Sequence, residues 1–188
     1  GSGADTILLS DEVYALTLPG AGEDMNATGD LDITDDLAIV GKGVDQTEVN
    51  VGSLGDRVFD LRPGAGTVIF ADLTLAGGNV SGDGGGVYNG NADLTLVDVV
   101  ISDNVATGAG GGVYVHDADA HLAQTGASRI MDNEAVLGGG VAIYSGTMGL
   151  SGGEVVSNTA SSSGGGVYVS QSGAILSQTG GTIGFNEA

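Results

Sequence analysis

The segment Gly110-Gly111-Gly112-Val113-Tyr114 decides the fold, because close copies of it recur along the chain. The other copies are Gly84-Gly85-Gly86-Val87-Tyr88, Gly138-Gly139-Gly140-Val141-Ala142 and Gly164-Gly165-Gly166-Val167-Tyr168. The third glycines of successive copies lie 26, 28 and 26 residues apart. A fixed period in the twenties is typical of a solenoid, in which each repeat forms one coil.

A second marker has the same period. Four asparagines, each followed two residues later by alanine, are spaced 29, 25 and 28 residues apart: Asn104, Asn133, Asn158 and Asn186. Asparagine tolerates the left-handed backbone conformation, and its amide can hydrogen-bond to a copy of itself in the next coil. We therefore expect these four residues to form a ladder along the solenoid.

Each repeat contains three short runs of alternating apolar and polar residues, bounded by glycine, aspartate or asparagine. Such runs are typical of strands, and none of them has helical spacing with caps. Coils of this kind stack with their strands roughly 4.8 Å apart and bury small aliphatic side chains in a narrow lumen. The sequence predicts an all-β, right-handed parallel β-helix, a single-stranded solenoid with three strands per coil and about six to seven coils.

The organisation along the chain follows from where the repeat is regular. Residues 1–3 resemble a cloning remnant. Residues 4–29 are expected to form an N-terminal cap with the first strands, and residues 30–83 the irregular first coils. Residues 84–188 are expected to form four regular coils that lack a C-terminal cap. Since solenoids need covered ends for solubility, we expect partners for the ends, either copies of the chain or neighbouring coils of a longer parent.

Composition narrows the classes of function. Glycine supplies 37 of 188 residues, aromatic residues make up 4%, and cysteine is absent, which excludes disulfides and thiolate catalysis. The formal net charge is −20, from 24 acidic and 4 basic residues. Nucleic acid is not expected as a partner, because binding phosphates requires lysine and arginine. No apolar run is long enough for membrane insertion as a helix. A surplus of negative charge attracts cations and suits a salty or calcium-containing exterior.

The triple-glycine blocks together with Asn-x-Ala resemble bacterial right-handed parallel β-helix repeat proteins. They are also similar to the repeats of chlamydial polymorphic outer membrane proteins, which combine a Gly-Gly-hydrophobic motif with Phe-x-x-Asn. Only Phe185-Asn186 approaches that second motif here, with a different spacing. The stretches 29–43 and 56–60 are similar to the first coils of large secreted bacterial β-helix proteins. The resemblance implies an extracellular or cell-surface stalk, adhesin or passenger, and it supplies no conserved active site to transfer to this chain.

Catalytic groups are sparse. The resemblance to polysaccharide lyases of this shape implies calcium-binding acids beside a catalytic basic residue. Arg129 is the only basic residue of the regular coils. Asp132 lies near it in the sequence, and Asp103 is expected one coil away. A glycoside hydrolase needs two carboxylates, for which the candidates are Asp30, Asp32, Asp35 and Asp36. Surface ion pairs and aspartate-rich turns explain the same residues. We therefore expect no catalytic residues, with carbohydrate cleavage as the alternative.

Calcium binding is a stronger hypothesis than catalysis, although no cofactor is required by the sequence. Hard cations bind clustered oxygen ligands, and the candidate residues are Glu23, Asp24, Asp30 and Asp32. A solvated acidic surface is the alternative explanation. His116 and His121, with Asp117 and Asp119 between them, could in principle bind zinc, but two exposed histidines are the simpler expectation.

Four tyrosines form a candidate ligand-binding column: Tyr88, Tyr114, Tyr144 and Tyr168. If Val87 and its equivalents face the lumen, Tyr88, Tyr114 and Tyr168 stack outward, with Ala142 interrupting the column and Tyr144 beside it. An exposed aromatic column could bind glycans. The alternative is a ladder that only stabilises the sheet.

Taken together, these observations predict a non-catalytic extracellular structural or adhesive module that assembles end to end. A β-helix that binds or cleaves carbohydrate is the alternative.

Overall fold

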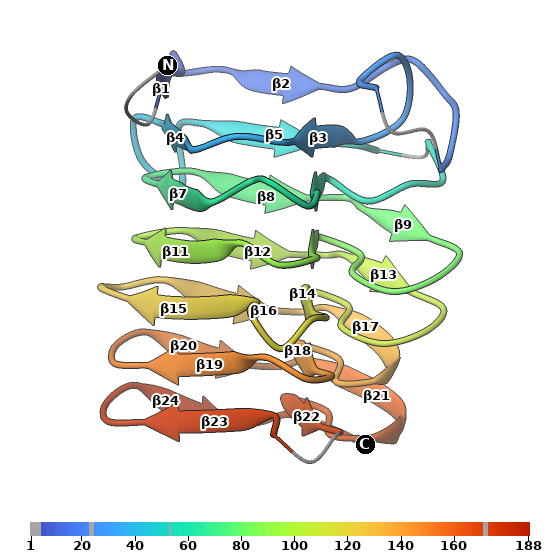
Figure 1. Ribbon diagram of the computed structural model, residues 1–188, viewed down its shortest axis with the longest axis vertical. Coiled ribbons are helices and arrows are strands. Elements are labelled where there is room, and N and C mark those ends of the chain that lie inside the picture. Colours follow the sequence, from blue (N-terminus) through green and yellow to red (C-terminus); the bar gives the residue numbers. More distant parts are fainter. Residues whose placement is uncertain (1–4, 23–24, 53, 171–172) are drawn as a thin grey trace.

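The chain is a stack of parallel coils with its N-terminus at one end and its C-terminus at the other (Figure 1). The computed structural model describes residues 5–22, 25–52, 54–170 and 173–188. All regular elements among them are strands, and they include no helix that could span a membrane. Every pairing between these strands is parallel, from the first coil to the last, and the predicted β-solenoid is confirmed.

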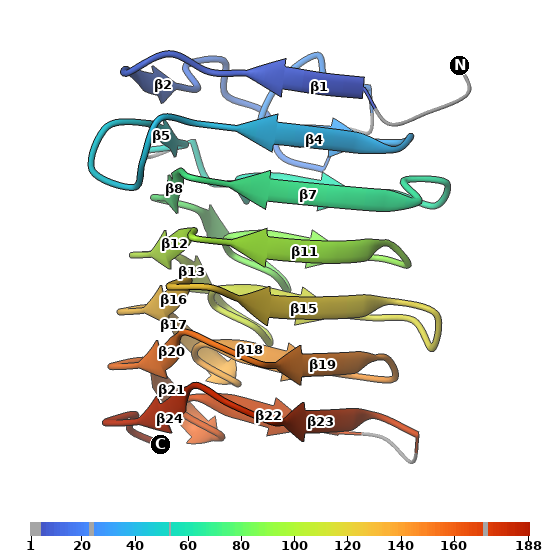
Figure 2. The same cartoon turned by 90° about the vertical axis from the view of Figure 1, so that its left-hand side faces the viewer.

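Three sheets run along the length of the solenoid, and sheet A faces the viewer in Figure 2. Sheet A contains β1 (Asp5–Leu8), β4 (Leu37–Val40), β7 (Thr67–Ala71), β11 (Asp93–Val97), β15 (His121–Thr125), β19 (Thr147–Leu150) and β23 (Ile175–Gln178). Sheet B contains β2 (Val13–Ala15), β5 (Glu48–Asn50), β8 (Thr74–Ala76), β12 (Val100–Ser102), β16 (Arg129–Met131), β20 (Glu154–Val156) and β24 (Thr182–Gly184). Sheet C contains β3 (Leu31–Ile33), β6 (Phe59–Leu61), β10 (Val87–Asn89), β14 (Val113–Val115), β18 (Val141–Ile143) and β22 (Val167–Val169).

The three strands predicted for each coil are those of sheets A, B and C, and the later coils add a short fourth strand. This sheet D contains β9 (Asn79–Val80), β13 (Val105–Ala106), β17 (Glu134–Leu137) and β21 (Thr159–Ser163). It projects to one side between sheets B and C (Figure 1). Val80, Ala106 and Ala135 form a small buried cluster of their own there. The alanines of the first two Asn-x-Ala markers, Ala106 and Ala135, therefore pack in this projection, outside the lumen.

Inside the lumen, apolar side chains at equivalent positions lie above one another. In sheet C, Val87, Val113 and Val141 are paired in register and fully buried. In sheet B the equivalent column contains Ile101, Ile130 and Val155. Because successive side chains of a strand point to opposite faces, burial of Val113 and Val115 directs Tyr114 to the outside of the solenoid.

The three glycines of each block meet different requirements. The first has a left-handed backbone, as at Gly110 with φ of 68°. The third has no room for a side chain, since a Cβ atom at Gly112 would lie 2.7 Å from the carbonyl oxygen of Gly140 in the next coil. Close contact between coils therefore fixes this segment as glycine.

A buried ladder of asparagines follows the end of sheet B. The Nδ2 atom of Asn104 donates to Oδ1 of Asn133 (3.0 Å), Asn133 donates likewise to Asn158 (2.9 Å), and Asn158 to Asn186 (3.0 Å). The left-handed conformation, expected at the asparagines themselves, instead belongs to the residue before each one. These residues are Asp103, Asp132, Ser157 and Phe185. Because the preceding residue adopts the left-handed conformation of the turn, the side-chain amide of each asparagine can point inward.

Candidate functional site

The outer face of sheet C carries the most concentrated chemistry of the described residues. Its strands place one outward residue per coil in register, and the resulting "outer column" is Asp32, Asp60, Tyr88, Tyr114, Ala142 and Tyr168. The column thus begins with two carboxylates and continues with aromatic rings. Both parts lie on one continuous face of the rod.

The aromatic part is a packed cluster of tyrosines with a histidine. The ring centroids of Tyr88 and Tyr114 are 5.4 Å apart. His116 lies 5.7 Å from both rings and also stacks on Tyr144, at 5.7 Å and 9° between the ring planes. Tyr114 is buried, Tyr88 and Tyr168 are half-buried, and only Tyr144 is well exposed, at 39%. The column therefore faces outward from the lumen without being an open aromatic surface.

A cavity of about 200 Å³ lies beside the later tyrosines. Its walls include Tyr114 and Tyr168 from sheet C, Tyr144 immediately after β18, and Leu137 from sheet D. Leu137 therefore forms part of one side of the cavity, while the rings of Tyr88, His116 and Tyr144 pack near Tyr114. Burial raises the pKa of Tyr114 well above its usual value of 10, and the negative charge of Asp83 adds to the effect. A lining of this kind suits the apolar face of a sugar ring or another small ring.

The acidic part of the column forms a buried cluster in the first coils. Carboxylate oxygens of Asp30, Asp32 and Asp60 all lie within 4.8 Å of one another, and all three residues are buried. Arg57 and Arg62 approach from the side: Nη1 of Arg57 lies 2.8 Å from Oδ2 of Asp60 and 3.5 Å from Oδ2 of Asp30. Nη1 of Arg62 lies 3.1 Å from the same Oδ2 of Asp60.

The cluster retains excess negative charge despite the two arginines. Burial, together with the nearby charge of Asp56, raises the pKa of Asp30 to about 7, although the charge of Arg57 acts to lower it. Asp56 is itself buried, and its Oδ2 atom accepts no hydrogen bond within the described part of the chain. Four carboxylates thus face two guanidinium groups in a region largely closed to water.

Asp30 and Asp32 are members of the metal site expected from the sequence, whereas Glu23 and Asp24 lie outside the described residues. Asp60 was not expected. A signal for it exists, since Leu31-Asp32-Ile33 and Phe59-Asp60-Leu61 are the same apolar-Asp-apolar triplet spaced by one coil of 28 residues. That spacing places Asp60 directly beneath Asp32 on the outer face.

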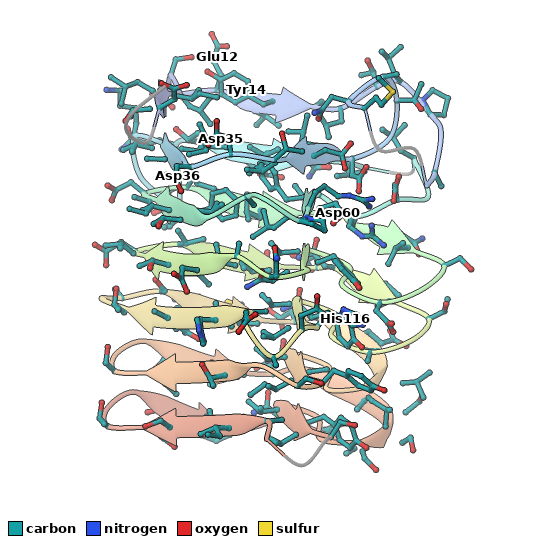
Figure 3. All side chains as sticks on the ribbon, viewed as in Figure 1. Glu12, Tyr14, Asp35, Asp36, Asp60 and His116 are labelled. Atoms are coloured by element: carbon teal, nitrogen blue, oxygen red, sulfur yellow. The ribbon has the colours of Figure 1, made fainter. Side chains whose placement is uncertain are left out.

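The other candidate residues are not brought together. Asp35 and Asp36 lie at a different corner of the coil from Asp60 (Figure 3). His116 belongs to the aromatic cluster and has Nδ1 2.8 Å from Asp117, whereas the imidazole Nδ1 of His121 on sheet A lies 2.6 Å from the Thr147 hydroxyl oxygen. Among the described residues, Asp30, Asp32 and Asp60 are the only group of three potential metal ligands.

Arg129 and the two aspartates considered for a lyase site, Asp103 and Asp132, also remain separate. The guanidinium of Arg129 lies 3.0 Å from the sulfur of Met131 on the exposed side of sheet B, and the described residues show no ion pair for it. Asp103 and Asp132 occupy exposed turns next to the asparagine ladder. Geometry therefore gives no support to a catalytic pair around Arg129.

Comparisons of the chain with protein-family models, curated proteins and solved structures found no significant match.

Proposed function

We propose that this chain is a non-catalytic structural or adhesive module of a bacterial surface or secreted protein, and that its ends associate with the ends of other copies. The observation that carries the proposal is the contrast between the middle and the ends of the lumen. Val113 and Val141 are fully buried in the middle, whereas Val169, at the equivalent lumen position to Ile143 in the last coil, is 43% exposed. Lumen side chains without a covering coil favour association.

The N-terminal end has the same property. Ile7 of β1 is in register with Ile39, which faces the lumen, and Ile7 is 46% exposed. Around it lies an apolar hollow of about 180 Å³, lined by Leu9, Tyr14, Leu16 and neighbouring apolar residues. The end strands also carry an edge without a partner strand among the described residues, and such an edge accepts a further strand readily.

Placement outside the cell rests on composition and on the resemblance of the repeats to bacterial surface proteins. A net charge of −20 keeps a glycine-rich rod soluble, and salt or divalent cations at the cell surface screen its self-repulsion.

Association can be measured by sedimentation velocity over a wide range of protein concentration. We expect the parent chain to associate as concentration rises, and Val169→Asp to remain monomeric because it places a charge on the end surface. Val136→Asp is the matched control, since Val136 is similarly exposed (39%) but lies on the side of the rod, in sheet D. A parent chain that stays monomeric throughout, or equal association of both variants, would contradict the proposal.

Carbohydrate binding is the second candidate function. The observation in its favour is the cavity between sheets C and D, where Tyr144 is exposed beside the half-buried Tyr168. Aromatic rings of this kind bind the apolar faces of sugars. Loss of glycan binding in Tyr144→Ala would identify this cavity as the site.

A further inference from the structure

The buried acidic cluster has the dimensions of a cation site. Calcium binds oxygen ligands at about 2.3–2.6 Å, so two ligands of one ion can be no more than roughly 5 Å apart. The carboxylate oxygens of Asp30, Asp32 and Asp60 meet that condition, lying within 4.8 Å of one another. Asp32 and Asp60 come from paired strands of adjacent coils, β3 and β6.

A second observation points to a ligand at the same place. The side chains of Asp30 and Asp60 are only 3% and 5% exposed, and the Oδ1 atom of each is buried without a hydrogen-bond donor in the described ranges. The ion pairs with Arg57 and Arg62 use the Oδ2 atoms. A buried carboxylate oxygen without a donor is costly, and a cation in contact with it removes that cost.

Charge gives a third argument. Asp30, Asp32, Asp56 and Asp60 carry four negative charges if ionised, and Arg57 and Arg62 carry two positive charges, so the cluster has a net charge of −2. A divalent cation neutralises this charge completely. Ligands that are all carboxylate oxygens favour a hard cation such as Ca²⁺ over zinc or copper.

We propose that Asp30, Asp32 and Asp60 bind a hard divalent cation of the calcium class between the first coils of the solenoid. The ion joins β3 to β6 across the coil boundary and stabilises the acidic start of the outer column. This proposal is independent of the association of the ends and of glycan binding, because its ligands belong neither to the exposed lumen side chains at the ends nor to the aromatic cavity.

The first test titrates CaCl₂ into chelator-treated protein by calorimetry, at about 0.15 M KCl so that weak binding to the acidic surface is screened. We expect one saturable site in the parent chain and an increase in Kd of at least about tenfold in Asp60→Asn, which removes one charged ligand. Asp119→Asn removes the same charge from an exposed turn and is the matched control, with an unchanged Kd.

A second readout does not depend on the folding of Asp60→Asn. Tyr88 is the register neighbour of Asp60, so Tb³⁺ bound in the cluster should emit when tyrosine is excited. Tyr88→Phe should lose most of this emission while its Kd for Ca²⁺ stays within twofold of the parent chain. Absence of saturable Ca²⁺ binding in the parent chain would overturn the proposal. So would equal binding by folded Asp60→Asn and Asp119→Asn, or full Tb³⁺ emission from Tyr88→Phe.

Discussion

The buried columns of the solenoid and the outer column of sheet C differ in how much they change from coil to coil. Inside, valine lies over valine and asparagine over asparagine through successive coils. Outside, the same register that pairs Phe59 with Val87 places the carboxylate of Asp60 beside the ring of Tyr88. The backbone geometry is therefore constant while the chemistry of the outer face changes.

The difference shows which positions the fold requires. A buried asparagine must satisfy its own amide and that of the next coil, so substitution affects two coils at once. An outward side chain does not have to form hydrogen bonds with the next coil, so it can contact ions or ligands. Substitutions inside should therefore cost stability, and substitutions outside should mainly change interactions with ions or ligands.

The largest effect is expected for Asn133→Ala. Its amide donates to the carbonyl oxygen of Ile101 (2.9 Å) and to Asn158, and its Oδ1 atom accepts from Asn104. Removal leaves several buried groups unpaired, and we expect the free energy of unfolding to fall by about 4 kcal/mol. Urea denaturation measures it, with exposed Glu134→Ala as the control. A loss no larger than that of the control would show that the ladder is dispensable.

A smaller effect is expected from the ionisation of Tyr114, which is outward but buried. Its raised pKa means that above pH 10 the folded chain retains a proton that the unfolded chain has lost. The folded state then binds more protons, so stability falls as pH rises above 10. Unfolding midpoints measured between about pH 9 and 11 should fall less steeply in Tyr114→Phe than in the parent chain. Identical slopes would argue against a buried hydroxyl at this position.

The smallest effect on stability is expected for Tyr144→Ala. The ring is 39% exposed and its main packing contact is His116, so we expect a loss of less than about 1 kcal/mol. Val136 on sheet D is equally exposed, so Val136→Ala should lose a similarly small amount of stability in thermal unfolding. If the cavity binds glycans, only Tyr144→Ala should lose binding on a glycan array. A large loss of stability would place Tyr144 among the residues that the fold requires.

Much of the fold could be predicted from the sequence because two markers share one period. The spacing of Gly86, Gly112, Gly140 and Gly166 sets the coil length, and the alternation around Val113 sets which side chains face the lumen. Parallel stacking of coils follows from these two facts alone. The asparagine spacing likewise indicates which residues lie above one another.

The site was less predictable, because it depends on contacts between segments without a strong repeat. Leu137, which lines the cavity with Tyr114, belongs to sheet D, and the short strands of this sheet, such as the two-residue β13, leave little signal in the sequence. Asp60 joins Asp30 and Asp32 through register in the irregular first coils. The sequence pattern there is one apolar-Asp-apolar triplet at 31–33 and its copy at 59–61, and the pairing of β3 with β6 is needed to show that the two aspartates lie side by side.

The asparagine ladder also has a direction. Each bond between two of its asparagines runs from an amide donor to the carbonyl oxygen of the asparagine in the next coil toward the C-terminus, and all the strands run parallel. Two rods can extend such a stack only head to tail, since a face-to-face pair would oppose both directions. A head-to-tail contact that does not close on itself has no natural stopping point, and it generates filaments of variable length in place of dimers.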